Sequence, residues 1–255
     1  RYNAALIPFH NSTDHMTFNE APIGVPAVTF TNWPDDYIHT SDDDLWNIDR
    51  TQLQRNAFAV AAIAYFLARA EEKHAPALAT EVYGRSAARL GRALQTGLAR
   101  ISAGAPQAYA DAVNVVEQSV ERDTRALESV AVIAGGKRSL LDGFIAGLRK
   151  LRQTHLAELS AQFLALSGAR TLPLEELSAA EKELQKLKPQ LSGGPAEFLE
   201  RRNKVKFVQG LDGLMAFEAL NFVDGKRSGL DIYRAVRAEA QSAPEGYYRG
   251  VEADK

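Results

Sequence analysis

The sequence contains no cysteine among its 255 residues. This absence excludes disulfide bonds and thiolate metal sites, so any metal ion must take histidine and carboxylate ligands. The absence of cysteine does not identify the cellular compartment.

The sequence also has little net charge and no long apolar run. The formal net charge is −2, which gives no overall attraction to nucleic acid or to an anionic membrane. No apolar run approaches the roughly 18 residues that a membrane-spanning helix needs. The first residue is Arg1, and residues 2–9 are too short for a signal peptide, so we expect that the chain has been cut at its N-terminus.

The residues able to do chemistry gather in one stretch, residues 10–49. Three of the five histidines lie there, among seven aspartates. Residues 32–50 show no periodicity, and loops of this length inside compact domains are usually functional or disordered. The candidate site is therefore expected near the start of the chain.

The pattern around this stretch is typical of an α/β layer. Two short apolar runs, residues 4–9 and 27–30, are predicted to be strands, and the second is β-branched and aromatic. Asp14 is suited to cap a helical turn that ends near Asn19. Residues 51–69 predict a helix that would pack on a sheet whose other strands precede Arg1.

The rest of the chain is predicted to be helical. Alanine, leucine and charged residues dominate from residue 77, with glycine and proline as punctuation. Because the turns are short, the helices should pack antiparallel. The predicted helices are 77–102, 106–134, 138–167, 174–188, 214–221 and 228–241, the last with Ser228 as its N-cap.

His39, taken alone, supports two interpretations. It follows Tyr37 in an acidic loop, and neutral imidazole is the commonest metal ligand, with Asp42 and Asp43 near enough to orient it. The alternative is a surface histidine beside aspartates that cap the following helix. Spacing alone favours this alternative.

Three motifs that follow one another along the chain favour the interpretation of His39 as a metal ligand. They are Ser-Thr-Asp-His-Met-Thr-Phe at 12–18, Gly-Val-Pro-Ala-Val-Thr-Phe at 24–30, and Asp-Tyr-Ile-His-Thr-Ser-Asp-Asp at 36–43 with Asn-Ile-Asp at 47–49. Together they resemble the closing segment of the di-zinc aminopeptidase family. That family comprises bacterial leucyl-type exopeptidases, with glutaminyl cyclases and glutamate carboxypeptidases as relatives. The resemblance covers about residues 5–70.

The resemblance implies a role for each matched residue. His39 corresponds to the final zinc-binding histidine, and Asp14 to an acid that hydrogen-bonds within the active-site network, with His15 holding the turn. Asp42 or Asp43 would order the ligand loop. The family often has an aromatic that helps to stabilise the oxyanion at the position of Ile38, and Tyr37 lies one position earlier. This departure leaves the oxyanion role open.

The family uses two zinc ions, held by two histidines and three carboxylates, together with a catalytic glutamate. Such a metal pair lowers the pKa of a bridging water. Only His39 can be matched here. His74 and His155 lie in helical patterns without the family's His-x-Asp or Asp-Glu arrangements, and we interpret them as ordinary helix-surface histidines.

We therefore expect a mixed, mainly α chain. Residues 1–72 would be the C-terminal end of an α/β zinc-exopeptidase domain, and residues 73–255 a helical domain with a bundle at 77–190 and a smaller unit at 195–255. The full-length protein would be a zinc-dependent exopeptidase, in the first place an aminopeptidase, and this fragment would be inactive because most ligands precede Arg1. The alternative is a non-catalytic peptidase-like module for binding or dimerisation.

The expected partner is a peptide substrate, with neither nucleic acid nor membrane. Some family members carry a helical domain after the peptidase domain that makes a dimer. The bundle resembles that arrangement in layout only, and a homodimer through it is an expectation. The resemblance favours a secreted or periplasmic protein. The two basic residues of Gly225-Lys-Arg-Ser228 raise a helix-turn-helix contact to phosphate as an alternative, and the neutral overall charge favours a solvated turn.

Overall fold

The computed structural model is helical throughout its ordered elements. It describes residues 5–11, 13–32, 35–104, 107–174, 176–204, 211–244, 246–248, 251 and 253. The α-helices are α1 (His15–Asn19), α2 (Arg50–Arg69), α3 (Ala75–Ser102), α4 (Ala108–Ser129), α5 (Asp142–Ser167), α6 (Ala179–Lys186), α7 (Pro195–Lys204), α8 (Gly213–Asn221) and α9 (Gly229–Ser242). Short 3₁₀ helices are η1 (Leu45–Asn47), η2 (Glu72–His74), η3 (Val130–Val132) and η4 (Arg138–Leu141).

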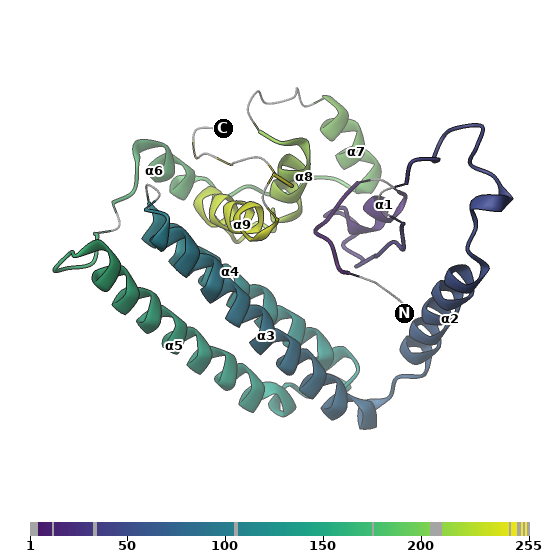
Figure 1. Cartoon of the computed structure of the whole chain (residues 1–255), viewed down its shortest axis with the longest axis horizontal. Helices are drawn as coiled ribbons and strands as arrows, with labels where there is room; N and C mark the ends of the chain where they lie inside the picture. The colour runs from purple at the N-terminus through teal and green to yellow at the C-terminus, as the bar shows by residue number, and fades with distance from the viewer. Residues whose placement is uncertain are drawn as a thin grey trace.

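Helices α3, α4 and α5 form a three-helix bundle in which each helix packs on the other two. Figure 1 shows α4 running antiparallel to both α3 and α5, as the short connections predicted. The predicted long helices are confirmed to within a few residues at most of their ends, although η3 and η4 flank the turn at Gly135 and Gly136. Pro106 lies outside the described residues.

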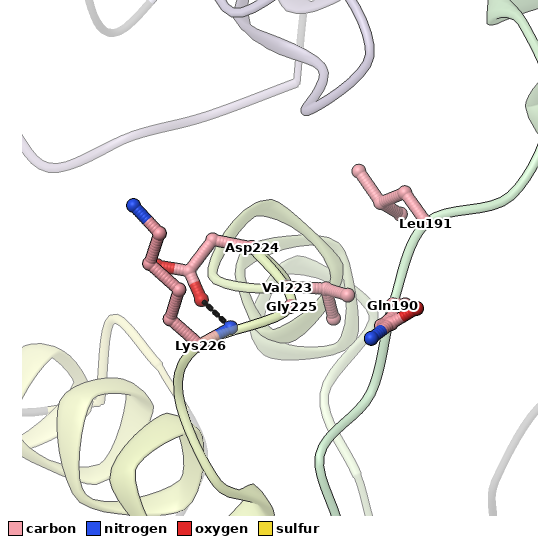
Figure 2. A pocket seen from close by; sticks show the side chains of 6 residues that line it. All are labelled: Gln190, Leu191, Val223, Asp224, Gly225 and Lys226. Atoms are coloured by element: carbon pink, nitrogen blue, oxygen red, sulfur yellow. Dashed lines mark hydrogen bonds between the residues drawn. The ribbon is translucent and has the colours of Figure 1, made fainter.

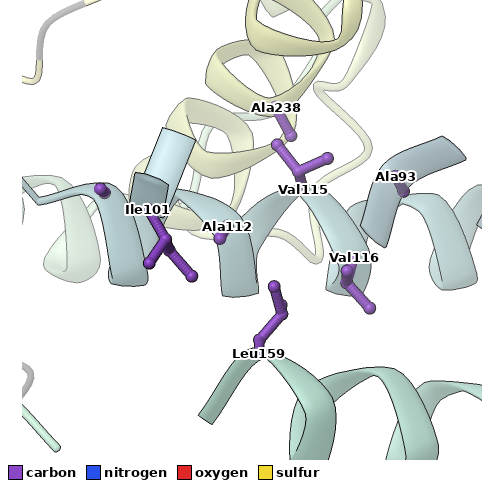
Figure 3. Packing of buried hydrophobic residues seen from close by; sticks show 8 residues of the cluster. Ala93, Ile101, Ala112, Val115, Val116, Leu159 and Ala238 are labelled. Atoms are coloured by element: carbon purple, nitrogen blue, oxygen red, sulfur yellow. The ribbon is translucent and has the colours of Figure 1, made fainter. Parts of the chain in front are cut away.

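The bundle has an apolar core. Ala112, Val115 and Val116 from α4 meet Leu159 from α5, and Figure 3 shows Ala238 of α9 beside them. A Cβ atom at Gly97 of α3 would lie 2.9 Å from the Cβ of Ala112. The absence of a side chain at Gly97 therefore lets α3 approach α4 closely.

Helices α6, α8 and α9 form a smaller unit that rests on the bundle through α4. Arg237 of α9 makes a forked ion pair with Asp111 of α4, with nitrogen–oxygen distances of 2.8 and 3.1 Å. The Asn114 side-chain amide donates to the Arg234 carbonyl oxygen at 2.9 Å. These contacts fix α9 across the bundle.

Local capping explains the boundaries of α9 and α6. The Ser228 hydroxyl accepts from the backbone N–H of Asp231, whose carboxylate accepts from the backbone N–H of Ser228, so the predicted N-cap is confirmed. The same reciprocal box between Ser178 and Glu181 starts α6 at Ala179, later than the predicted start at 174. Helix α7 was not predicted, since its sequence is mostly polar.

The predicted strands are absent from the described residues. Residues 5–9 and 27–30 have no strand assignment, and Ala4 lies outside the described residues. A strand exists through hydrogen bonds to a neighbouring strand, and the part of the chain that the structure describes offers none. The mainly α class is confirmed, whereas the α/β layer at the N-terminus is not shown.

Helix α2 stands apart from the bundle in Figure 1. None of its residues is buried, and Phe58, Tyr65 and Leu67 are 75%, 69% and 62% exposed. The helix formed where residues 51–69 predicted it, but the expected sheet beneath it is not among the described residues. No helix in the described ranges is long and apolar enough to cross a membrane.

Candidate functional site

His39 lies at the tip of a tight turn in the acidic loop. The Asp35 carboxylate accepts from the backbone N–H groups of Tyr37 and Ile38, both at 3.1 Å. The Thr40 hydroxyl donates to the Tyr37 carbonyl oxygen at 2.6 Å. These bonds hold His39 at φ +64°, a left-handed conformation that residues other than glycine adopt rarely. The imidazole is therefore presented to solvent from an ordered backbone.

Asp42 and Asp43 follow in the same loop, and their backbones take part in its order. The Asp42 N–H donates to the Thr40 hydroxyl at 3.2 Å, and its carbonyl oxygen accepts from the Asn47 side chain at 2.6 Å. The N–H of Asp43 donates to the Thr40 carbonyl oxygen at 3.3 Å. The proposed ordering role thus has a main-chain basis, while their carboxylates stay exposed.

The neighbouring aspartates cap helices. The Asp44 carboxylate accepts from the N–H of Leu45 at the start of η1. The Asp49 carboxylate accepts from the N–H groups of Thr51 and Gln52 at 2.8 and 3.2 Å and begins α2. Of the aspartates beside His39, Asp44 thus caps the short η1, whereas α2 is capped by Asp49.

The side chain of Tyr37 packs against another aromatic ring of the loop. Its ring packs edge-on against Trp46, with 5.4 Å between the ring centroids. Its backbone carbonyl is the group that Thr40 holds. Tyr37 thereby supports the turn that carries His39, and its predicted catalytic role stays a prediction.

Asp14 and His15 lie in the turn that forms α1. Asp14 occupies the N-cap position as predicted, but its side chain makes no capping bond, and its backbone carbonyl accepts from the Thr17 N–H at 3.1 Å. His15 Nδ1 lies 2.6 Å from the Thr13 hydroxyl, and its ring is 5.7 Å from that of Phe9. These contacts lie within the turn, and the role that the resemblance implied for His15 stays a prediction.

The described residues do not by themselves fit a zinc centre. A protein zinc site takes three or four histidine, cysteine or carboxylate ligands around one point. Within the described ranges, no three such side chains are grouped so that they could hold a metal ion. His39, Asp14 and a third ligand are thus not brought together.

The segment around Asp14 is anchored to the far end of the chain. The Tyr247 hydroxyl donates to the Pro8 carbonyl oxygen at 3.1 Å, and the Tyr248 hydroxyl donates to that of Phe9 at 2.7 Å. The Phe9 ring stacks on Phe217 of α8 at 4.9 Å with 4° between the planes. The first motif is therefore positioned by the C-terminal helical unit.

A second set of contacts follows α1. The Ala21 N–H donates to the Asn221 side-chain oxygen at 2.9 Å, and the buried Glu20 pairs with Arg202 of α7. A buried carboxylate needs such a partner. These contacts join residues about two hundred positions apart, and no local sequence pattern could have predicted them.

Two glutamates of the C-terminal helices, Glu218 of α8 and Glu239 of α9, have raised pKa values. Burial, and then the charge of Glu218, raise the pKa of Glu239 to about 7. Burial also raises the pKa of Glu218 on α8 and that of the Tyr248 hydroxyl. The sequence offered one signal that was missed, a glutamate inside the apolar run Leu214–Leu220.

The other histidines lie away from the loop. His74 accepts from the N–H of Glu71 at 3.0 Å within η2. His155 lies half-buried on α5, and burial lowers its pKa. His74 thus has an ordinary structural position. The interpretation of His155 as a helix-surface histidine is wrong, because its Nδ1 is buried without a hydrogen-bond partner among the described residues.

A shallow pocket of about 460 Å³ lies between the turn after α8 and the connection after α6 (Figure 2). The Asp224 carboxylate accepts from the Lys226 N–H at 2.9 Å, which shapes the turn. Across the pocket lie Gln190 and Leu191. None of the predicted site residues lines it.

Comparison with known families gives one finding for the N-terminal region. Residues 3–64 match the model described as peptidase family M28. The matched range contains Asp14, His15, Tyr37 and His39. The proteins of this family are zinc peptidases, so the match indicates that the N-terminal segment is peptidase-like. No curated protein and no solved structure matches the chain.

Proposed function

We propose that this chain is part of a zinc-dependent exopeptidase, an aminopeptidase, in which residues 3–64 form one side of the active site. The observation that carries the proposal is the M28 match over the range that holds all three motifs. A substrate peptide would bind where the loop of His39 faces the rest of that site.

His39 is the residue proposed to bind metal. Its turn is fixed by Asp35 and Thr40, and within the described ranges its ring makes no hydrogen bond to a carboxylate. Strained backbone positions cluster at functional sites, and the φ of +64° at His39 is such a position. A pre-set imidazole costs less ordering when it binds a metal ion.

The other ligands must come from residues that the described structure does not place beside His39. One imidazole cannot hold zinc, so the chain alone is proposed to be inactive. When bound, the metal would supply a polarised water and carbonyl. The residues of this chain would present one ligand and order its loop.

The exposure of α2 supports a larger domain around this segment. Residues 57–68 are apolar on every side of the helix, and helices of this kind are normally buried. A covering layer is what an α/β peptidase domain would supply. The proposal thus accounts for an apolar helix that nothing among the described residues covers.

The test is made on the natural full-length protein with His39→Ala. We expect the variant to lose at least one-hundredfold in kcat/KM for a leucyl amide and to bind less zinc, measured by elemental analysis of the purified protein. His155→Gln serves as control, because His155 lies on α5, and it should retain activity. Unchanged hydrolysis and zinc content in His39→Ala would overturn the ligand assignment.

A second measurement tests the view that ligands are missing. The 255-residue chain should bind zinc weakly and show no hydrolysis. A zinc affinity near micromolar for this chain alone would contradict it.

One observation favours the alternative, a non-catalytic binding or dimerisation module. Ile38 occupies the place of the aromatic that the resemblance associates with the oxyanion. If the full-length protein binds peptides or forms dimers without cleaving leucyl amides, the alternative replaces the peptidase proposal.

A further inference from the structure

A hollow of about 590 Å³ lies where α4, α5 and the start of α9 meet. Four arginines line it, namely Arg125 of α4, Arg149 and Arg152 of α5, and Arg227 in the turn before α9. This volume is within the range of small-molecule pockets. No residue of the peptidase-like segment takes part.

The carboxylates of the hollow are already engaged. Glu117 pairs with Arg152, with one bond at 2.6 Å, and Glu121 pairs with Arg125 at 2.8 Å. The Asp231 carboxylate accepts from the backbone N–H and the hydroxyl of Ser228, both at 2.8 Å. Two of the four arginines are thereby neutralised.

Arg227 is a largely buried cation with incomplete pairing. Its side chain is 16% exposed, its nearest carboxylate oxygen in the described structure is that of Asp224 at 3.9 Å, and it donates to the Phe222 carbonyl oxygen at 3.2 Å. Its guanidinium lies 5.0 Å from the Phe222 ring centroid. Burial, and then the nearby charge of Arg125, lower the pKa of Arg227, and the charges of Asp224, Glu121 and Asp231 offset part of this effect. An added anion would relieve both costs.

Arg149 is an exposed arginine of the hollow and the second one without a close carboxylate partner in the described structure. Across the part of the chain that the structure describes, its side chain has no ion pair and no hydrogen bond. It lies one turn of α5 before Arg152, so both side chains reach the same side of the helix. The hollow therefore holds two arginines without a close carboxylate partner, beside the carboxylate of Asp231 and with that of Asp224 3.9 Å from Arg227.

We propose that this hollow binds a phosphate dianion, as free phosphate or as the phosphate group of a small phosphomonoester. A phosphate group carries about −1.5 to −2 charges at neutral pH, and the guanidinium groups of Arg149 and Arg227 keep donors that can bind its oxygens. The planar guanidinium fork also fits phosphate oxygens in pairs. A water molecule occupies about 30 Å³ in the liquid, and the hollow has a volume of about 590 Å³. It therefore has room for an organic group beside the phosphate.

This site gives a role to the basic turn Gly225–Ser228. Arg227 lines the hollow between the helices, whereas Lys226 lines the other pocket, shown in Figure 2. Two adjacent basic residues thus face different recesses. A small anion fits this arrangement better than a nucleic-acid backbone, which would need both on one surface.

Isothermal titration calorimetry tests the proposal. The whole chain is titrated with inorganic phosphate and, separately, with glycerol 2-phosphate, at an ionic strength held constant with sodium chloride. We expect saturable binding of both at one site, and tighter binding of the ester if the organic body contributes. Tighter binding of inorganic phosphate assigns the site to the free ion.

The variants locate the site. Arg149→Gln should weaken binding at least tenfold, and Arg227→Gln should weaken it further. Lys150→Gln removes the same charge from the neighbouring exposed residue of α5 and should change the Kd less than twofold. Because Arg149 has no partner to lose, its variant should keep the thermal melting of the wild type, so it serves even if Arg227→Gln does not fold.

Three results would overturn the proposal. The first is no saturable phosphate or ester binding by the wild-type chain. The second is an equal loss in Lys150→Gln and Arg149→Gln, which would indicate diffuse attraction. The third is tighter binding of a short DNA duplex that depends equally on Lys226 and Arg227, which would assign the turn to nucleic acid.

Discussion

The three-helix bundle and helix α2 are both rich in apolar residues, yet only the bundle buries them. Leu90, Leu148 and Leu159 are fully buried, whereas Phe58 and Tyr65 of α2 are largely exposed. The difference does not lie in helix propensity, since all these segments form the predicted helices. It lies in how the apolar residues are arranged around each helix.

Helix α3 has one apolar face and α2 has several. Ala79, Leu90, Ala93 and Ile101 are buried at helical spacing, with charged residues between them, so one contact side suffices. Residues 57–68 of α2 carry no charge at all. The bundle is thus complete within the described chain, and α2 has the composition of a helix that needs cover.

The largest expected effect separates the two regions directly. Leu159→Ala should lower the free energy of unfolding by about 2–5 kcal/mol, because it leaves a cavity in the bundle core. Phe58→Ala in α2 should change it by less than about 0.5 kcal/mol. Both are measured by urea denaturation of this chain. A comparable loss in Phe58→Ala would mean that α2 is packed.

The next effect concerns pH and the buried carboxylate of α9. The pKa of Glu239 rises from 4.5 to about 7, so between these values the unfolded chain ionises while the folded chain keeps its proton. Stability should therefore fall as pH rises from 4.5 to 7, by about 3 kcal/mol. Glu239→Gln should remove that slope and be more stable than wild type at pH 8.

The control for this measurement is Glu176→Gln, which changes an exposed carboxyl group. Its stability should follow that of the wild type across the same pH range. A wild-type stability that does not fall between pH 5 and 8, relative to Glu239→Gln, would contradict the burial of this carboxyl in a shifted state.

The smallest effect concerns the anchoring of the first motif. Tyr248→Phe keeps the ring but removes the hydroxyl that donates to the Phe9 carbonyl oxygen, which should cost about 1 kcal/mol. Hydrogen exchange should quicken in residues 8–21. Tyr65→Phe, on the exposed α2, should alter neither quantity. Unchanged exchange in Tyr248→Phe would show that the anchor depends on the stacked rings instead.

The sequence predicted what local chemistry determines. The long helices, the N-cap at Ser228 and the helix stop at Gly168, where φ is +67°, follow from periodicity, capping and left-handed glycine. The strands at 4–9 and 27–30 were wrong for the described residues, because a strand depends on a partner that a local pattern cannot reveal.

The candidate site, too, has local features that the sequence could indicate and long-range contacts that it could not. The turn that carries His39 and the cap at Asp49 are local, and sequence patterns could indicate them. The anchoring by Tyr247 and Tyr248 and the arginine hollow join distant segments. Such contacts follow from tertiary packing, which neither spacing nor composition encodes in a readable form.

The contact between Phe9 and Tyr248 also affects the order in which the segments can fold during synthesis. Synthesis proceeds from the N-terminus at about 5–20 residues per second. The bundle can assemble once α5 has left the ribosome, but the carbonyl oxygens of Pro8 and Phe9 have no tyrosine partners until almost the whole chain has been made. The segment that carries Asp14 and His15 is thus synthesised before the helices that hold it and reaches its place only after them.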